Sequence, residues 1–291
     1  MIRIAKRSES QWGMHLVLLL FTAACIFPLL LMFSISISDD KAIYSVGYSI
    51  WPSKTSFAAY TYIFQEPSLI LKAYGVSSIV TFGGGLLSII ILILVAFPLS
   101  RSDFAYRKPV NFLVFFTMLF NGGLIPTYIV VTQVYGLKDS LWALILPYLV
   151  LPWYVLLLRT FFSAIPKELI EASQIDGCSE NRLLWRIIVP ISKPAIATVG
   201  LLCILRYWND WYLSLLYMDN PNYQPLQLLL RTMINNILSL SQDFALGGTA
   251  DFPTESARMA MAIIAAGPML FIFLFFQRYF VSGLTVGAIK G

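Results

Sequence analysis

Residues 171–194 read Glu-Ala-Ser-Gln-Ile-Asp-Gly-Cys-Ser-Glu-Asn-Arg-Leu-Leu-Trp-Arg-Ile-Ile-Val-Pro-Ile-Ser-Lys-Pro and form a polar stretch between two long apolar segments. Just before it, Pro166 suits the first turn of a helix, where its missing N–H costs nothing. We expect that helix over Lys167–Asp176. Gly177 permits the positive φ of a tight turn, and Ser179 suits the N-cap of a second helix. The stretch therefore predicts a helix–turn–helix.

The second helix has one apolar face, because its apolar residues recur at the spacing of helical turns. We expect Pro190 and Pro194 to end it. Five charged side chains should then lie on the surface of a compact knob that moves as one body: Glu171, Asp176, Glu180, Arg182 and Arg186. The apolar face is made of Leu183, Leu184, Ile187 and Ile188.

The rest of the chain has the composition of a membrane protein. Of its 291 residues, 58% are hydrophobic and 12% are charged, whereas soluble domains are roughly 25% charged. Because about 20 apolar residues cross a bilayer and only helices or closed barrels satisfy their backbone there, we predict an all-α protein of one domain, 1–291. We expect transmembrane helices near Met14–Ile35, Tyr74–Leu99, Val110–Tyr135, Leu141–Phe161, Ala195–Tyr217 and Met259–Phe280.

Charge predicts the orientation of these six spans. The segments 1–13, 100–109, 159–194 and 278–291 hold 13 of the 20 Lys and Arg residues. By the positive-inside rule these segments lie in the cytoplasm, so both termini do as well. The outer loops are then 36–73 and 218–258, and the pI near 9.0 reflects topology instead of nucleic-acid binding.

Several predicted spans contain helix-weakening residues, namely Gly83-Gly84-Gly85, Asn121-Gly122-Gly123 with Pro126, and Pro147 with Pro152. Small residues allow helices to approach closely, and the freed backbone groups must be satisfied by neighbours. The pattern fits either tight packing with kinks or a bundle that opens and closes.

The fifth span carries a polar and aromatic cluster, Arg206-Tyr207-Trp208-Asn209-Asp210-Trp211-Tyr212. Charges within a span are costly and indicate function. Arg206 and Asp210 are four residues apart and could pair on one helix face. The cluster is either an interfacial belt with a structural ion pair or a sugar path, in which aromatic rings stack on sugars and polar groups bind hydroxyls. Its candidate residues are Tyr207, Trp208, Asn209, Asp210 and Trp211.

Other residue types argue against catalysis and metal binding by this chain. No GxxxxGK[ST] loop is present, so we expect no ATP site. His15 is the single histidine, which excludes a His-based zinc site or a Ser-His triad. Cys25, Cys178 and Cys203 lack metal or disulfide spacing. We expect no catalytic residues, no metal ligands and no cofactor bound by this chain.

The 171–194 stretch resembles the EAA coupling loop of ABC importer permeases. The match consists of Glu171-Ala172, Gly177 and Ile187-x-Val189-Pro190, with Val189 in place of the usual Leu and Ser173 in place of the usual second Ala. In that family the loop fits a cleft on a separate ATPase. The resemblance implies coupling roles for Glu171, Ala172, Asp176, Gly177 and Arg182.

Two further matches resemble carbohydrate permeases in particular. Trp-Asn-Asp followed by an aromatic is similar to their fifth helix. The carboxyl end, Gln277–Gly291, resembles the terminal signature of maltose-type permeases, especially those for complex oligosaccharides. The cytoplasmic tail 281–291 then implies a second docking point for the ATPase, at Gly283, Gly287 and Lys290.

Together the resemblance implies the multi-pass permease subunit of an ATP-driven, binding-protein-dependent oligosaccharide importer in the cell membrane. Its expected partners are a second permease in a heterodimer, two ATP-binding cassette subunits that bind ATP and Mg, an extracellular solute-binding protein, and lipid. It is not itself an enzyme, and no nucleic acid is expected. The rival hypothesis is a secondary transporter or channel that needs no ATPase.

Overall fold

A computed structural model describes residues 7–245 and 253–288. Over these residues the chain is helical, and apart from an isolated bridge between Ser38 and Thr55 it contains no β-structure. The chain forms two compact units, one of residues 1–67 with 230–267 and one of residues 68–229 with 268–291. The prediction of an all-α protein is confirmed.

The first unit begins with a long apolar helix, α1 (Arg7–Ser36), followed by α2 (Asp40–Val46) and α3 (Ala58–Ile63). It also contains most of α14 (Leu226–Ala245) and the first part of α15 (Thr254–Ala288). The carboxylate of Asp40 accepts hydrogen bonds from the backbone N–H groups of Glu255 (2.9 Å) and Ser256 (3.1 Å). An acidic side chain there satisfies donors that a helix N-terminus leaves unpaired. Asp40 therefore joins the start of α2 to the start of α15.

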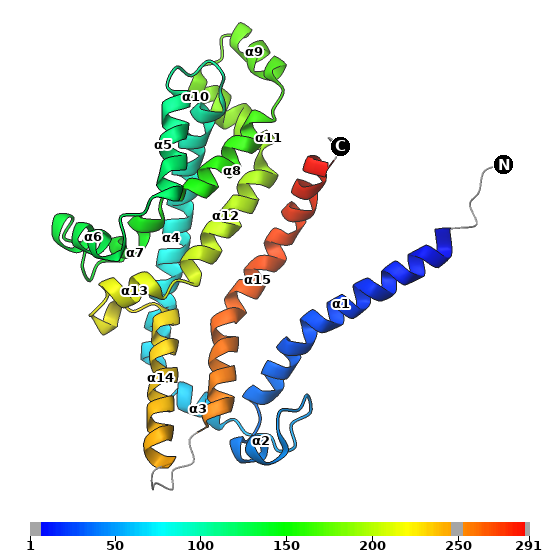
Figure 1. Ribbon diagram of the computed structural model, residues 1–291, viewed down its shortest axis with the longest axis vertical. Helices are drawn as coiled ribbons and strands as arrows, with labels where there is room; N and C mark the ends of the chain where they lie inside the picture. Colours follow the sequence, from blue (N-terminus) through cyan, green and yellow to red (C-terminus); the bar gives the residue numbers. More distant parts are fainter. Residues whose placement is uncertain (1–6, 246–252, 289–291) are drawn as a thin grey trace. The chain divides into compact units, whose positions relative to one another are not determined.

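The second unit is built on α4 (Pro67–Ser100), which stays helical through all three glycines. Its other helices include the last part of α15 and those coloured from cyan to yellow in Figure 1, namely α5 (Arg107–Leu119), α6 (Leu124–Ile129), α7 (Leu141–Ile145), α8 (Pro152–Ser163), α9 (Lys167–Ile175), α10 (Glu180–Leu183), α11 (Val189–Ile191), α12 (Lys193–Trp208) and α13 (Tyr212–Tyr217). Short π-helical turns, Val130–Val134 and Leu184–Ile188, extend α6 and α10, and 3-10 turns form at Leu146–Tyr148 and Pro221–Tyr223.

Two glycines explain how closely α4 and α12 pack. A Cβ atom added to Gly84 would lie 2.8 Å from the Tyr207 ring, and one added to Gly85 would lie 3.3 Å from Ile204. The Tyr207 hydroxyl hydrogen-bonds to Ser88 (2.9 Å) and donates to the carbonyl of Ile145 (3.0 Å). The interpretation of the glycines as packing residues therefore fits this part of α4.

Within the described residues, three helices are long and apolar enough to span a membrane: the Trp12–Ser36 part of α1, α4, and the Thr254–Gln277 part of α15. Three more candidates are pairs of helices joined at a sharp bend: α5 with Leu124–Val134 (113°), Leu141–Tyr148 with α8 (49°), and Glu180–Ile191 with α12 (84°). The number of spans predicted from the sequence, six, is reached in the described residues only if each bent pair counts as one span.

The bends lie where the sequence weakens the helix. The chain leaves α5 at Phe120, and Gly123 adopts φ +90°, which favours glycine. Pro152 begins α8. The expected continuous span 195–217 is also divided, because α12 ends at Trp208 and α13 begins at Tyr212.

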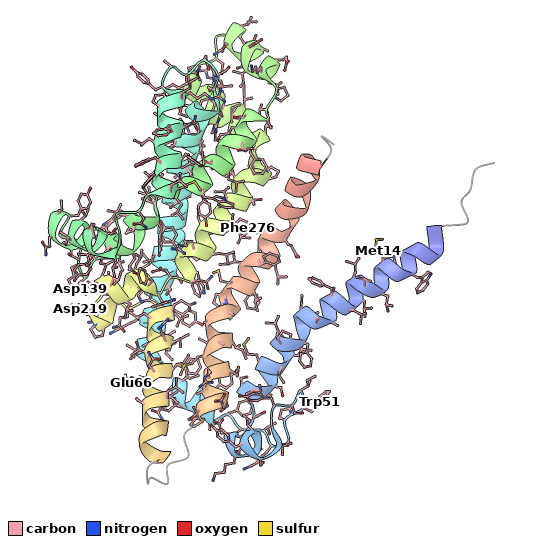
Figure 2. The ribbon with its side chains drawn as sticks, viewed as in Figure 1. Met14, Trp51, Glu66, Asp139, Asp219 and Phe276 are labelled. Atoms are coloured by element: carbon pink, nitrogen blue, oxygen red, sulfur yellow. The ribbon has the colours of Figure 1, made fainter. Side chains whose placement is uncertain are left out.

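One corner of the second unit is held by a strained residue. Asp139 has a positive φ of 56°, unusual for a residue other than glycine. Its carboxylate accepts from the backbone N–H groups of Asp219 (2.7 Å) and Asn220 (2.8 Å), and Figure 2 shows Asp139 beside Asp219. The neighbouring Lys138 forms an ion pair with Asp219 at 2.6 Å. These bonds join the loop before α7 to the loop after α13.

At the carboxyl end α15 continues as a helix to Ala288. Gly283 and Gly287, which the resemblance places in a docking tail, are therefore part of this helix. Lys290 lies outside the described residues.

Candidate functional site: a helical loop and a polar pocket

The 159–194 loop folds as the predicted helix–turn–helix. Pro166 is the N-cap of α9, one position before the first turn that the sequence suggested. After α9 the chain turns at Gly177, whose φ is +70°. The N–H of Cys178 donates to the carbonyl of Ser173 (2.9 Å), and the N–H of Gly177 donates to that of Gln174 (3.0 Å). This pair of bonds is a Schellman motif, which requires a left-handed residue at the position of Gly177.

The second helical segment runs from α10 through a π-turn into α11. Ser179 occupies its N-cap with an extended backbone, although its side chain makes no capping hydrogen bond. The predicted apolar face is confirmed, because its four residues lie in or against a buried cluster that also includes α4 and α8 side chains. Helicity ends at Ile191, one residue after Pro190, and Pro194 lies in the first turn of α12.

The surface of this knob carries the residues that the sequence singled out. Glu171, Ala172, Asp176, Gly177 and Arg182 are all exposed, as are Glu180 and Arg186. The apolar side chain of Ile175 is 86% exposed. One face of the loop is therefore anchored in the protein, and the other presents charges around an uncovered isoleucine.

Arg101 connects this knob to the end of α4. Its side chain is only 9% exposed, and Nη2 lies 2.5 Å from Asp103 and 3.4 Å from Glu180. The guanidinium lies 5.9 Å from the centroid of the Phe97 ring. The hydrogen bond from Arg101 lowers the pKa of Asp103 below its usual value. Glu180 also accepts a hydrogen bond from the side chain of Gln174 on α9 at 3.4 Å, so it contacts both Arg101 and the first half of the knob.

From the sequence alone, Arg101 was only one of the basic residues of segment 100–109, which was expected to lie in the cytoplasm. Glu180 lies 79 residues further along the chain, and no spacing rule relates positions so far apart. Only the pairing of α4 with the knob brings them together.

A polar pocket of about 390 Å³ lies at the break between α12 and α13. Side chains from four helical segments and from the break itself line it, and the polar and aromatic ones are Tyr148, Tyr154, Arg206, Asn209, Asp210, Trp211 and Tyr212. Tyr148, from the 3-10 turn after α7, was not among the candidates from the sequence, because it lies far from them along the chain.

Tyr148 changes the expected relation between Arg206 and Asp210. Its hydroxyl donates to Asp210 Oδ1 (2.8 Å), while the N–H of Leu213 donates to Oδ2 (3.1 Å). The Arg206 guanidinium lies over the Tyr148 ring, 4.1 Å from the centroid. Within the described residues, Arg206 and Asp210 form no ion pair with each other; instead, both contact the same tyrosine.

The five candidate residues of this segment divide into two groups. Tyr207 and Trp208 are 4% and 3% exposed and face the protein interior. Asn209, Asp210 and Trp211 line the pocket. The division arises because α12 ends at Trp208, so the helical spacing that would place Trp208 and Trp211 on one face does not extend across the break.

Within residues 7–245 and 253–288, no cluster of three or more His, Cys, Asp or Glu side chains has the arrangement of a metal site. Cys203 is buried in the apolar cluster around α4, α8 and α12.

Comparison with known proteins gives consistent matches over most of the chain. Residues 70–286 match the protein family described as "Binding-protein-dependent transport system inner membrane component". The chain is 36% identical over 275 residues to the polygalacturonan/rhamnogalacturonan transport system permease protein YtcP of Bacillus subtilis (strain 168), covering 94% of this chain and 96% of that protein. It is 35% identical over 271 residues to Protein LplC of the same organism, covering 92% and 90%.

A solved structure has the same fold. It is the crystal structure of a bacterial ABC transporter involved in the import of the acidic polysaccharide alginate, and one of its chains matches with a TM-score of 0.79 and 25% sequence identity. The match covers 96% of this chain and 100% of that chain.

Proposed function

This chain belongs to the family of binding-protein-dependent transport system inner membrane components, and from that premise we propose that it is the permease subunit through which an ATP-driven importer moves an oligosaccharide across the cell membrane. The observation that carries the proposal is the knob of α9 to α11, anchored on one side and exposed on the other. The names of the carbohydrate permeases that it resembles support a saccharide as the substrate.

The expected assembly contains two different permeases, two ATP-binding cassette subunits that bind ATP and Mg, and an extracellular solute-binding protein. In it both termini of this chain and the knob face the cytoplasm. The positive-inside rule supports this orientation. ATP hydrolysis belongs to the cassette subunits, so this chain is not an enzyme.

Coupling would act through the exposed face of the knob. Glu171, Ala172, Asp176, Gly177 and Arg182 would contact a cleft on the ATPase, and Ile175 adds an apolar side chain that such a cleft would cover. The Schellman turn at Gly177 and the packing of Leu183 and Ile188 make the knob rigid. A rigid knob would move as one body with the ATPase and transmit that movement to the rest of the chain. The ion pair between Arg101 and Glu180 links the knob directly to the end of α4.

The substrate path would pass the pocket at the break after α12. Asn209 and Asp210 would bind sugar hydroxyls, and Trp211 would offer a face for stacking, while Tyr207 and Trp208 support the pocket wall from the interior. The last part of α15, with Gly283 and Gly287, together with Lys290, would form a second contact with the ATPase.

Gentle purification tests the proposed assembly. The tagged chain is solubilised from its native membrane in mild detergent, and co-purifying proteins are identified by mass spectrometry. A cassette ATPase and a second permease of this family are the expected partners. Recovery of the chain alone, or only as a homo-oligomer, would favour a secondary transporter or channel and contradict the proposal.

A further inference from the structure

We infer that the pocket after α12 accepts an acidic saccharide, and that Arg206 binds its carboxylate. This inference rests on the proposed function, because it assumes that the pocket forms part of a saccharide path. It adds the charge of the substrate, which neither the family nor the loop specifies.

The pocket is lined by one cation, Arg206, and one carboxylate, Asp210, and the two differ in the partners that they already have. Each oxygen of the Asp210 carboxylate already accepts a hydrogen bond, one from the Tyr148 hydroxyl and one from the N–H of Leu213. Arg206 is exposed and contacts the ring of Tyr148. Among the described residues, no carboxylate lies within ion-pair distance of its guanidinium. The pocket therefore holds a cation without a salt-bridge partner beside an anion whose oxygens are both engaged.

The position of Arg206 along α12 places its charge at the pocket. It lies 13 residues after the start of α12 at Lys193, or roughly 20 Å along the helix at 1.5 Å per residue. It is in the last turn of α12, which ends at Trp208, and the C-terminal end of a helix favours a cation. Stacking on Tyr148 adds to this stabilisation and orients the plane of the guanidinium.

A carboxylate is the ligand that best fits such a group. A planar guanidinium binds a carboxylate through two parallel hydrogen bonds, and its orientation is already constrained by the ring beneath it. Asn209 and Trp211 line the same pocket and supply a hydroxyl partner and a stacking face. A neutral sugar would contact only Asn209 and Trp211, whereas the carboxylate of a uronic acid would also bind Arg206.

Uptake by the complete transporter in proteoliposomes tests this inference. The probes are trigalacturonate and its trimethyl ester, which has nearly the same shape but no charge. We expect Arg206→Gln to lower ATP-dependent uptake of trigalacturonate about tenfold or more, as expected for loss of charge-assisted hydrogen bonds, while ester uptake changes less than about threefold. Arg206→Lys, which keeps the charge but not the planar fork, should fall between Arg206→Gln and the wild type.

Lys138→Gln is the matched control, because it removes an exposed cation that lies outside the pocket. It should leave the ratio of the two uptake rates unchanged. An equal effect of both substitutions on that ratio would indicate long-range attraction and overturn the inference. If Arg206→Gln does not assemble, an unchanged ratio in Arg206→Lys would overturn it.

The wild-type protein separates failure of this inference from failure of the proposed function. ATP-dependent uptake of neutral oligosaccharides without uptake of trigalacturonate would overturn only the acidic substrate. Absence of ATP-dependent uptake for every saccharide tested would instead count against the importer itself.

Discussion

Replacing Gly84 with alanine tests whether α4 and α12 pack as the structure indicates. The new Cβ would lie 2.8 to 3.1 Å from three atoms of the Tyr207 ring. That ring is buried, and its hydroxyl bonds to Ser88 and to the carbonyl of Ile145. It therefore cannot move away without breaking these bonds or separating the helices.

The expected magnitude is the sum of opposing contributions. Overpacking a core costs about 1–3 kcal/mol, and each lost hydrogen bond costs about 0.5–1.5 kcal/mol. Alanine is better than glycine in a helix by about 1 kcal/mol. If both Tyr207 hydrogen bonds are lost, we expect Gly84→Ala to lower the free energy of unfolding by about 1–5 kcal/mol.

Gly83 provides the matched control, since a Cβ there meets nothing within 4 Å. Gly83→Ala should be neutral or up to about 1 kcal/mol more stable, on helix propensity alone. Both variants are compared by SDS titration of the purified protein in detergent micelles, followed by circular dichroism. Equal stability of the two variants would refute the close packing of Tyr207 against α4.

Three further predictions concern the connections between helices. Arg101→Gln should reduce substrate-stimulated ATP hydrolysis by the assembled transporter while basal hydrolysis persists, because Arg101 joins the knob to α4; unchanged stimulation would argue against this route. Arg101 lowers the pKa of Asp103 in the folded protein, so the ion pair should stabilise the fold fully above the unfolded pKa of about 4, and this stabilisation should be lost as the pH falls below that value. In Asp103→Asn the free energy of unfolding should lack this acid-dependent loss, which acid titration of both proteins checks. Asp139→Ala should lower the free energy of unfolding by about 1–3 kcal/mol, because it removes the acceptor of two backbone N–H groups, those of Asp219 and Asn220, while residue 139 keeps its strained φ. Asp139→Asn, which retains an acceptor and tolerates positive φ, should cost less, and equal losses for both would show that the bonds to 219 and 220 contribute little.

Local patterns predicted the knob well because its determinants are close together in the chain. The turn at Gly177 needs only a residue that tolerates positive φ, and the buried face of α10 to α11 follows from helical spacing. Hydropathy likewise identified the long helices α1, α4 and α15, since each contains an apolar stretch long enough to span a membrane.

The sequence predicted less well where contacts between distant residues decide the structure. The spacing allowed Asp210 to pair with Arg206 four positions away, but the hydroxyl of Tyr148, 62 residues earlier, binds it instead. The span 195–217 was expected to be continuous, yet α12 ends at Trp208, where Asp210 caps the N–H of Leu213 at the start of α13. Hydropathy averages over such a break and cannot detect it.

Coupling of this chain to the ATPase through the knob is tested most directly by ATP hydrolysis of the reconstituted transporter. Hydrolysis is measured with and without the substrate-loaded binding protein, for the wild type and for Gly177→Asp. Aspartate tolerates the positive φ of this turn better than most residues but adds a charge to the exposed face of the knob, where no side chain would clash with it. We predict that the variant inserts into the membrane normally but loses substrate-stimulated hydrolysis. Wild-type stimulation in that variant would contradict coupling through the knob.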